Sequence, residues 1–304
     1  MTKSRLQTLI ERGEFVVTAE VGPPKSASSK GMKKHARHLK DSVDAVNITD
    51  NQTAVVRLSS MAGALHVMSE GVEPIMQMTC RDRNRIAIQS DILGAYSLGI
   101  RNLLCLTGDH QKFGNHPQAR GVFDLDSIQL IKALKDLRDE GQYISGDTTK
   151  FPAKMFIGAA ENPFADPFEY RAHRLKKKVD AGSDFIQTQA VFDVPRFARW
   201  MEMVRDQGLH EKTCITAGVI PAKSVGALRY MQGVPGLSIP DSLIERVKSA
   251  EDAAAEGIKV CIETIQQLSE IEGIKGVHVM AIAWEEVVPD IVGGAGLLPR
   301  PSLD

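Results

Sequence analysis

The chain has 304 residues, 43% of them hydrophobic and 25% charged, which is the composition of an ordinary globular protein. Its 37 basic and 38 acidic side chains give a formal net charge of −1, so electrostatics gives no case for binding to nucleic acid or to an anionic membrane. Residues 1–13 lack the apolar core of a signal peptide, and no run has membrane-spanning length. We therefore expect a cytoplasmic protein.

The four cysteines are widely spaced and form no CxxC pair (Cys80, Cys105, Cys214 and Cys261). Three of them lie in or beside expected buried strands, where a cysteine usually acts as a small apolar residue. This pattern argues against a metal site and against a disulfide framework, and it favours a reducing compartment.

Short apolar segments alternate with helical periodicity along the whole chain. The expected strands cover residues 15–21, 43–48, 74–79, 103–106, 154–160, 184–189, 213–220 and 276–281. Helical spacing covers residues 30–40, 55–69, 85–98, 126–137, 166–181, 193–204, 224–231 and 240–271. The segment 103–106 is too short for a helix and lacks polar alternation, which suits a strand of a parallel sheet buried on both faces. Eight such units predict a single-domain (β/α)8 TIM barrel. Two doubly wound domains are the alternative, although no linker separates them.

Segments outside this repeat have expected roles of their own. Residues 1–14 carry a short helix that would close the bottom of the barrel with Leu6, Leu9 and Ile10, residues 15–292 form the barrel, and residues 293–304 form a tail without periodicity. The sequence Asp-Pro-Phe-Glu at 166–169 predicts a capping box at a helix start. The polar loop 110–124 is longer than most connections and is a functional candidate, whereas residues 141–150 are expected to be an exposed insertion.

Polar side chains gather where the expected strands end. In a barrel these ends share one face, which would bring together Glu20, residues 49–51, Gln77, Thr79, residues 107–109, residues 160–162, Gln187, Gln189 and residues 218–221. The set has no histidine pair, no Ser/His/Asp group and no glycine-rich phosphate fingerprint. It therefore lacks the residues that usually catalyse nucleophilic or metal-assisted hydrolysis. One carboxylate among amides suits general acid catalysis on a bound organic molecule.

The motifs at these ends resemble those of a known family, the methylenetetrahydrofolate reductases of the MetF type. They follow the family's order and span most of the expected barrel: TAEVGPP at 18–24, MTC at 78–80, TGD at 107–109, LKKKVDAG at 175–182, TQ and FD within 188–193, and AGVIP at 217–221. Each motif is short, and their shared order and placement carry the match.

This resemblance implies a barrel that holds FAD and interconverts 5,10-methylenetetrahydrofolate and 5-methyltetrahydrofolate. Glu20 is then the general acid that protonates the folate nitrogen and opens the imidazolidine ring to an iminium, which takes a hydride from reduced flavin. Such an acid needs a raised pKa, and burial at a strand end is one way to raise it. Without the resemblance, Glu20 would be interpreted as an exposed glutamate at a strand end.

The resemblance also implies ligand contacts. Asp109 matches an aspartate near the flavin ring that modulates the redox potential and contacts folate, and Gln189 matches a folate-binding glutamine whose amide suits a pterin edge. Lys177 and Lys178 match a basic pair near the flavin phosphates. Further flavin contacts are expected at Thr49, Gln77, Thr79, Gly108 and Ala160. From local sequence alone, Asp109 is a turn residue and the two lysines belong to a solvated helix face.

Three positions depart from the family pattern. Thr49-Asp50 stands where Thr-Tyr is usual, and Gln77 stands where a histidine is usual. Beyond the last strand the chain has Trp284 and Glu285 where the family has an arginine near folate, and Trp284 is expected to stack on the flat ring of the substrate. These changes indicate a divergent branch, in which the polar segment 81–84 is a candidate to replace lost contacts.

The departures leave several alternatives. FMN or no tightly bound flavin are alternatives to FAD, and the electron donor is expected to be NADH, NADPH or a partner subunit. The apolar residues near 297–298 and the exposed helices favour a homo-oligomer or a heteromeric complex. Two other functions stay open: a non-redox subunit that binds folate or a methyl carrier in a methyltransferase or corrinoid-linked complex, and an unrelated barrel enzyme.

Overall fold

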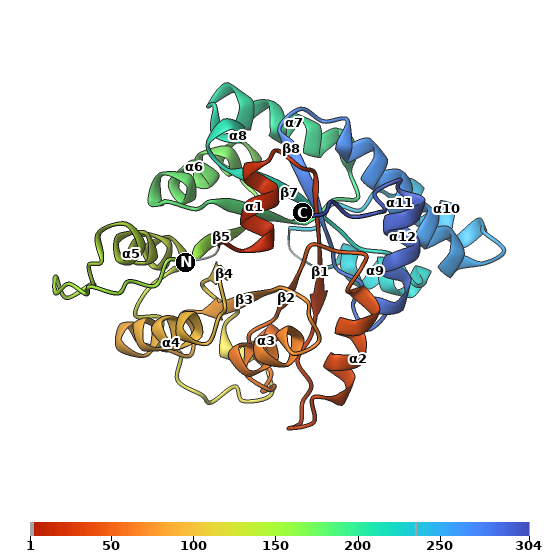
Figure 1. The fold of residues 1–304 in the computed structure, drawn as a ribbon. Coiled ribbons are helices and arrows are strands. Elements are labelled where there is room, and N and C mark those ends of the chain that lie inside the picture. The colour runs from red at the N-terminus through yellow and green to blue at the C-terminus, as the bar shows by residue number, and fades with distance from the viewer. Residues whose placement is uncertain (1–2, 235, 304) are drawn as a thin grey trace.

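The computed structural model describes residues 3–234 and 236–303, and its centre is a closed barrel of eight parallel strands (Figure 1). The strands are β1 (Val16–Val21), β2 (Ala45–Ile48), β3 (Pro74–Thr79), β4 (Asn102–Leu106), β5 (Phe156–Glu161), β6 (Phe185–Ala190), β7 (Cys214–Val219) and β8 (Ile274–Val279). Each strand pairs with the next in sequence, and β8 closes the ring against β1. The prediction of a (β/α)8 barrel is therefore confirmed, and the alternative of two doubly wound domains is wrong.

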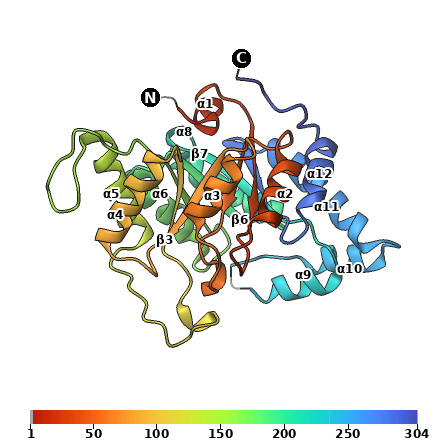
Figure 2. The same ribbon diagram turned by 60° about the horizontal axis from the view of Figure 1, so that its bottom comes forward.

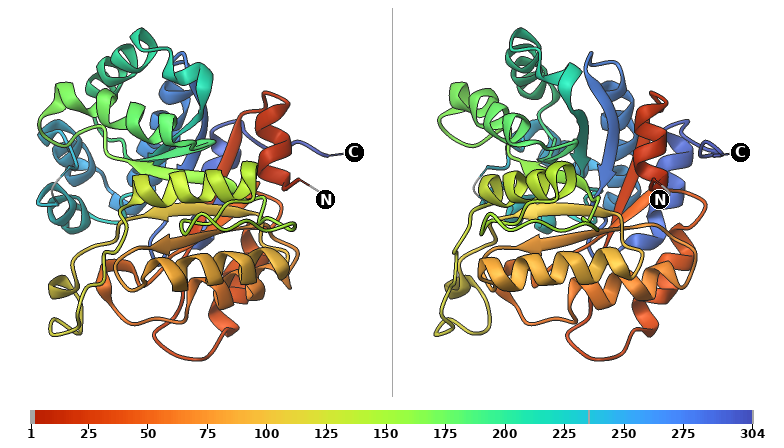
Figure 3. Two further views of the ribbon diagram at one scale, coloured as in Figure 1. Left: turned by 90° about the vertical axis from the view of Figure 1, so that its left-hand side faces the viewer. Right: turned by 60° about the vertical axis from the view of Figure 1, so that its left-hand side comes forward.

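Helices cover the outside of the barrel (Figure 3). They are α2 (Lys30–Leu39), α3 (Ser60–Met68), α4 (Arg85–Ser97), α5 (Ser127–Glu140), α6 (Arg171–Ala181), α7 (Val194–Asp206), α8 (Leu209–Lys212), α9 (Val225–Gln232), α10 (Asp241–Ser249), α11 (Ala253–Ser269) and α12 (Val288–Gly294), while α1 (Arg5–Glu11) lies at the bottom of the barrel. Short 3₁₀ turns are η1 (Gln52–Ala54), η2 (Gln111–Phe113), η3 (Phe168–Tyr170) and η4 (Glu285–Val287). Outward side chains of the strands, such as Val17 and Ala19, are buried with these helices in the main apolar core.

The bottom of the barrel, where the strands begin, is filled by apolar side chains. A separate buried cluster there consists of Val16, Ala45, Ile75, Leu104, Phe156, Phe185 and Cys214, with Leu6 and Leu9 of α1. Gly158 makes room for this packing, because a Cβ at that position would lie 2.2 Å from an atom of the Phe185 ring. The interior is thus solid at this end, as it is in most barrels of this size.

The N-terminal helix closes the bottom as the sequence predicts. The Ser4 hydroxyl caps α1 by accepting a hydrogen bond from the Gln7 backbone N–H, and Leu6 and Leu9 are fully buried against the strands. Ile10 packs beside them and is partly buried. The apolar spacing of this short helix therefore reflects its role as a plug.

The C-terminal segment lies across the same end of the barrel (Figure 2). Asp44, whose side chain is fully buried, accepts hydrogen bonds from Arg5 of α1, from Arg300 of the tail and from the backbone N–H of Val17. Leu297 also packs on the main core, while Leu298 is 39% exposed. The tail is therefore a folded part of the bottom face, and of Leu297 and Leu298 only Leu298 is exposed enough to support the expected oligomer contact.

Four local expectations differ from the structure. The helix expected over 55–69 begins only at Ser60, because the Arg57 and Leu58 backbone N–H groups donate to Asn51 Oδ1 and to the Pro24 carbonyl and hold this segment extended. The capping box at 166–169 is wrong. The side chain of Asp166 is 95% exposed and makes no cap, and the turn η3, which buries Phe168, separates it from the first residue of α6.

The other two differences lie near the C-terminus. The long helix expected over 240–271 is two helices, because Asp252 accepts hydrogen bonds from the Ala254 and Ala255 backbone N–H groups and starts α11 anew. Helix α12 was not expected, and its last residues overlap the segment predicted as an aperiodic tail. In the first case the helical pattern continues across a short break, and in the second the glycines at 293–294 obscure a short helix.

Candidate functional site at the mouth of the barrel

A cavity of about 370 Å3 opens where the strands end, at the face opposite α1. We call it the mouth cavity. It is lined by Glu20, Asn47, Gln77, Leu104, Leu106, Ala160, Glu161, Asn162, Arg171, Arg174, Lys178, Gln187, Thr188, Gln189, His278 and Met280. The alternation of each strand turns every second side chain inward, and parallel register places these residues at similar heights. The volume is at the lower end of the range for small-molecule sites.

A polar layer forms the floor of this cavity above the apolar cluster. Asn47 Nδ2 donates to Gln187 Oε1 at 2.6 Å, and Gln187 Nε2 donates to Thr18 Oγ1 at 3.3 Å. Thr18 Oγ1 also lies 2.9 Å from His278 Nδ1. Burial lowers the pKa of His278 to about 4, so its imidazole is neutral near pH 7. The floor is therefore a connected, uncharged hydrogen-bond network.

Glu20 is the acid at this face. It lies near the end of β1 with its side chain turned inward, opposite Asn47 of β2. Burial is the main cause that raises the pKa of Glu20 to about 7, and the Glu285 carboxylate adds to the rise. A hydrogen bond from Gln52 Nε2 at 3.4 Å and the Arg57 charge oppose it. A carboxyl group with this pKa is present in both protonation states near neutral pH, which suits general acid catalysis.

Cationic side chains line one side of the cavity, and they come from a single helix. Arg171, Arg174 and Lys178 are spaced i, i+3 and i+7 on α6, which puts them on one face. Lys178 is buried, and its ammonium donates to Glu161 Oε2 at 2.7 Å and to the Ala160 carbonyl oxygen. Within the described residues, neither arginine forms an ion pair, and the buried Nε of Arg171 has no hydrogen-bond partner. This side of the cavity therefore offers two uncompensated positive charges.

Several residues predicted to bind the cofactor lie away from the mouth cavity. Thr79 is buried and bonds to Asp50, which in turn pairs with Arg83 at 2.7 Å. Gly108 has a φ of +93° and approaches the Thr79 and Arg81 side chains so closely that a Cβ there would lie 3.0–3.1 Å from them. These polar residues hold the loops of β2, β3 and β4 together.

The remaining predicted residues divide between the rim and the surface. Thr49 is buried, and its Oγ1 has no partner among the residues that the structure describes. Asp109 is exposed, and its backbone carbonyl accepts a hydrogen bond from Arg81 Nη1 at 3.2 Å. Lys177 donates to the Tyr170 hydroxyl on the outer side of α6, and the Trp284 ring lies 5.4 Å from Lys223 Nζ. Of the predicted contacts, Glu20, Gln77, Ala160, Lys178 and Gln189 line the mouth cavity.

Some residues of the site are not predicted from the sequence. Asn47 and His278 could have been found from strand alternation, since each lies two residues from an inward-facing strand residue. Arg171 and Arg174 carried the signal of helical spacing with Lys178. No local sequence pattern predicts that Glu161 pairs with Lys178, because that pairing depends on how α6 packs on β5.

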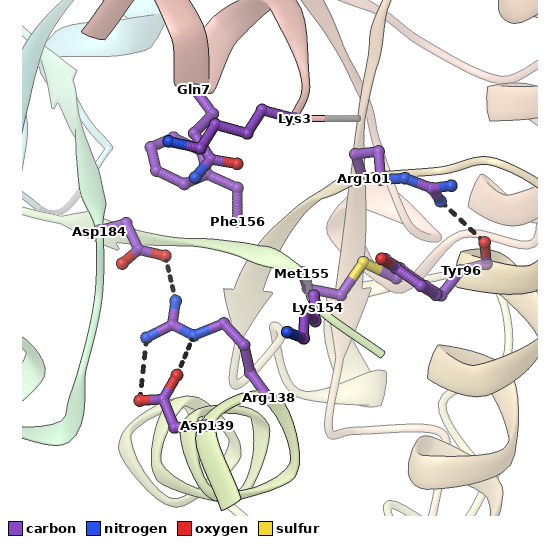
Figure 4. A pocket seen from close by; sticks show the side chains of 10 residues that line it. All are labelled: Lys3, Gln7, Tyr96, Arg101, Arg138, Asp139, Lys154, Met155, Phe156 and Asp184. Carbon is purple, nitrogen blue, oxygen red and sulfur yellow. Dashed lines mark hydrogen bonds and ion pairs between the residues drawn. The ribbon is translucent and has the colours of Figure 1, made fainter. Parts of the chain in front are cut away.

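A larger cavity of about 580 Å3 lies at the bottom face, between α1, α5 and the start of β5 (Figure 4). Both of its carboxylates bond to Arg138, which contacts Asp139 and Asp184, and Lys3 bonds to Glu11 outside the cavity. Active sites of this fold lie at the opposite face. We therefore take the smaller mouth cavity as the candidate site.

Two further features bear on the kinds of site that are present. Within residues 3–234 and 236–303, no group of three or more His, Cys, Asp or Glu side chains could hold a metal ion, and the four cysteines are buried free thiols. No helix of this described part is long and apolar enough to cross a membrane.

The family model for methylenetetrahydrofolate reductase matches residues 5–296. The chain belongs to this family. Among curated methylenetetrahydrofolate reductases, protein 2 of Schizosaccharomyces pombe is 25% identical over 233 residues, which cover 74% of this chain and 36% of the relative. The 5,10-methylenetetrahydrofolate reductase of Pectobacterium carotovorum is 23% identical, with 75% of this chain and 72% of that relative covered. The chain thus spans about a third of the yeast methylenetetrahydrofolate reductase, and the resemblance predicted from the motifs is confirmed.

Solved structures show the same fold at low identity. A protein of Clostridium thermocellum, described as binding two copies of 5-methyl-5,6,7,8-tetrahydrofolic acid, has a TM-score of 0.67 and 14% identity, and the match covers 96% of this chain and 98% of that one. A 2,3-dimethylmalate lyase has a TM-score of 0.50 and 13% identity, with 90% and 79% covered. These likenesses establish the barrel alone.

Proposed function

We propose that this chain interconverts 5,10-methylenetetrahydrofolate and 5-methyltetrahydrofolate, with Glu20 as the general acid. Membership of the methylenetetrahydrofolate reductase family supports this reaction. The observation that supports Glu20 as the acid is its position in the mouth cavity with a pKa raised to about 7. The folate-binding description of the Clostridium thermocellum protein, which has the same fold, agrees with a folate substrate.

The proposed acid step uses the burial of Glu20. In the methyl-forming direction, the protonated carboxyl donates its proton to the folate nitrogen whose bond to the bridging carbon breaks, and the carbon becomes an electrophilic iminium. Burial disfavours the carboxylate, so the carboxyl of Glu20 stays protonated near neutral pH and its proton is available for transfer to bound folate. In the reverse direction the same carboxylate takes the proton back.

Free amides in the mouth cavity are the proposed contacts for the pterin ring. Among the residues that the structure describes, the Gln77 amide and Gln189 Nε2 have no protein partner, whereas Gln189 Oε1 accepts from the Ala190 backbone N–H. Gln187 and Asn47 already satisfy each other in the floor. Gln77 and Gln189 can therefore donate to and accept from a ring edge without breaking existing bonds.

The residues present fit a flavin. Leu104, Leu106 and Met280 give an apolar surface for a flat ring, and Arg171 and Arg174 give the uncompensated cations that a flavin phosphate needs. Lys178 is already neutralised by Glu161, so we assign the phosphate contact to the two arginines in its place. When bound, a flavin would supply the hydride. Relatives named as NADPH and NADH enzymes in Caenorhabditis elegans and Oryza sativa support a nicotinamide electron donor.

The test of the acid is Glu20→Gln, which keeps the shape of the side chain and removes the transferable proton. We expect the rate of methyltetrahydrofolate formation to fall about 10²–10⁴-fold while the dissociation constant for 5-methyltetrahydrofolate stays within about twofold. Glu169→Gln, an exposed glutamate next to α6, is the matched control. Activity of the Glu20→Gln variant near that of the control would refute the role. Folate binding without turnover in the unaltered protein would favour a folate-binding subunit.

The test of the cofactor is the visible spectrum of freshly purified protein with mass identification of any released chromophore. We expect a flavin band that NADH or NADPH bleaches, and loss of most of this flavin in an Arg171→Gln/Arg174→Gln double variant. A protein that stays colourless when FAD or FMN is added would contradict the flavin assignment.

A further inference from the structure

Glu20 lies between two cavities. Besides the mouth cavity, it lines a second cavity of about 330 Å3, which we call the side cavity and which is also lined by His35, Gln52, Arg57 and Glu285. This space is room for several water molecules, each of which needs about 30 Å3. Glu20 is therefore accessible from a side that a ligand in the mouth cavity does not cover.

The side cavity is built from both ends of the chain. Helix α2 carries His35, and the turn η4 carries Glu285, and these two elements and α12 pack together on the flank of β1 (Figure 1). His35 Nδ1 lies 3.4 Å from Glu285 Oε2. The His35 side chain is 36% exposed and that of Glu285 only 11%, so the pair runs from solvent toward the interior.

The charged groups that face Glu20 from this side are Glu285 and Arg57, which act in opposite directions on its ionisation. Gln52 Nε2 donates to Glu20 Oε1 at 3.4 Å from the same cavity. The Arg57 guanidinium is held by the Pro23 carbonyl at 3.0 Å, which fixes it at the cavity wall. A carboxylate formed at Glu20 thus faces a second carboxyl group that an imidazole connects to solvent.

The proposed reaction, on which this inference rests, gives such a connection a use. Conversion of the methylene compound to the methyl compound adds one hydride and one proton. Glu20 supplies the proton and becomes a carboxylate, so it must regain one proton before the next turnover. Folate bound in the mouth cavity would cover the side of Glu20 that faces that cavity, whereas the side cavity would stay open to water.

We propose that the His35–Glu285 pair returns the proton to Glu20 through the side cavity. The imidazolium of His35 gives its proton to Glu285, the Glu285 carboxyl passes one through water in the cavity to the Glu20 carboxylate, and His35 takes a new proton from solvent. One proton enters for each proton that leaves with the product. In the reverse reaction the direction is inverted. His35 and Glu285 are positioning residues for Glu20, because neither lines the mouth cavity.

The variants are His35→Ala and Glu285→Gln, with His38→Ala as the matched control. His38 lies on the same helix and bonds to the Glu286 carbonyl at 2.9 Å, but it does not line the side cavity. We expect both relay variants to lose about tenfold or more in kcat with unchanged KM for folate, a larger solvent deuterium isotope effect, and partial rescue of His35→Ala by added imidazole. The control should behave like the unaltered protein.

A second measurement does not depend on turnover. After a rapid drop in pH, the infrared band of the protonated Glu20 carboxyl, identified by its absence in Glu20→Gln, should grow about tenfold more slowly in the relay variants with 5-methyltetrahydrofolate bound. Turnover and band growth that match the control in both variants would overturn the relay. Slower band growth in a protein without reductase turnover would retain the relay and refute the proposed reaction.

Discussion

Glu20 and His278 face the barrel interior from neighbouring strands, and burial shifts their pKa values in opposite directions. The carboxyl of Glu20 is kept protonated up to about pH 7, and the imidazole of His278 stays neutral down to about pH 4. In both cases the low-dielectric interior disfavours the charged form. The two shifts lead to different predictions, one for activity and one for stability.

The activity prediction concerns the state of Glu20. Because the methyl-forming reaction needs its protonated form, kcat/KM in that direction should decline about tenfold per pH unit above about pH 7. The methylene-forming reaction needs the carboxylate and should show the opposite dependence. Rates measured from pH 5 to 9 in both directions test this. A profile without a transition near pH 7 in either direction would contradict the assignment.

The stability prediction concerns His278. Its folded-state pKa of about 4 lies below the usual value of 6.5, so the unfolded chain binds the extra proton between these values and stability falls as pH decreases through this window. The full loss is about 3 kcal/mol. The raised pKa of Glu20 makes stability increase as pH falls over a similar range. The contribution of His278 is therefore measured as the difference in the free energy of unfolding between the unaltered protein and His278→Gln.

Urea unfolding at pH 7.5 and pH 4.5 makes this comparison. We expect His278→Gln, which can still bond to Thr18, to lose less stability on acidification than the unaltered protein by about 2–3 kcal/mol. The exposed His116→Gln serves as the control and should follow the unaltered protein. Equal acid sensitivity in all three proteins would rule out a buried neutral imidazole.

At the scale of elements, the packing of α6 on β5 depends on the buried ion pair of Lys178 and Glu161. Burial lowers the pKa of Lys178, and the Glu161 carboxylate opposes this shift. A buried pair of this kind contributes little compared with apolar residues of the same volume, but either member alone is a large penalty. Helix α6 is therefore fixed against β5 by an ion pair. Replacing one of its two residues should lower stability much more than replacing both.

A double-mutant cycle tests this dependence. Lys178→Met leaves the Glu161 carboxylate buried without its partner and should lower the free energy of unfolding by about 3–5 kcal/mol. Adding Glu161→Gln should restore most of that loss. Unfolding by urea at pH 7.5 gives the four free energies, and additive effects of the two substitutions would show that the pair is not coupled.

How much of this architecture could be predicted depends on the range of the interactions. The strands could be predicted because most are short, largely apolar runs that are buried on both faces, and their shared ends place Glu20, Gln77 and Gln189 at one cavity. Asp109 and Gly108 lie in loops whose course is set by contacts with Arg81 and Thr79, which local sequence does not reveal. The start of α6 was misplaced for the same reason, since tertiary burial of Phe168 overrides its local capping pattern.

At the scale of the whole molecule, stabilising and reactive parts occupy opposite faces of the barrel. The bottom holds the apolar cluster, the plug α1 and the network around Asp44, while the mouth holds the amides, the acid and the unpaired arginines. Because the two faces share few residues, substitutions at the bottom should alter stability without altering ligand affinity.

Arg300→Ala tests this separation. The substitution removes a charged hydrogen bond of 2.6 Å from the fully buried Asp44 and should lower the free energy of unfolding by about 2–3 kcal/mol. Folate affinity at a temperature where the variant is folded should stay within about twofold. Arg12→Ala, which removes exposed bonds to tail carbonyls, should cost less than about 0.5 kcal/mol. A change in folate affinity with Arg300→Ala would show that the faces are coupled.

Asp44 connects the N-terminal helix to the C-terminal segment, because it bonds to both Arg5 and Arg300 on the face away from the mouth. A linker or immobilising surface attached near either of these arginines would therefore project from that face and leave the route to Glu20 open. It also means that the segments next to Arg5 and Arg300 can be joined by a short peptide and the chain reopened within residues 145–148. These residues are exposed, whereas residues 141–144, which the sequence predicts to be exposed, are not, because Tyr143 and Ile144 pack on the core. The result would be a circular permutant with an unchanged mouth.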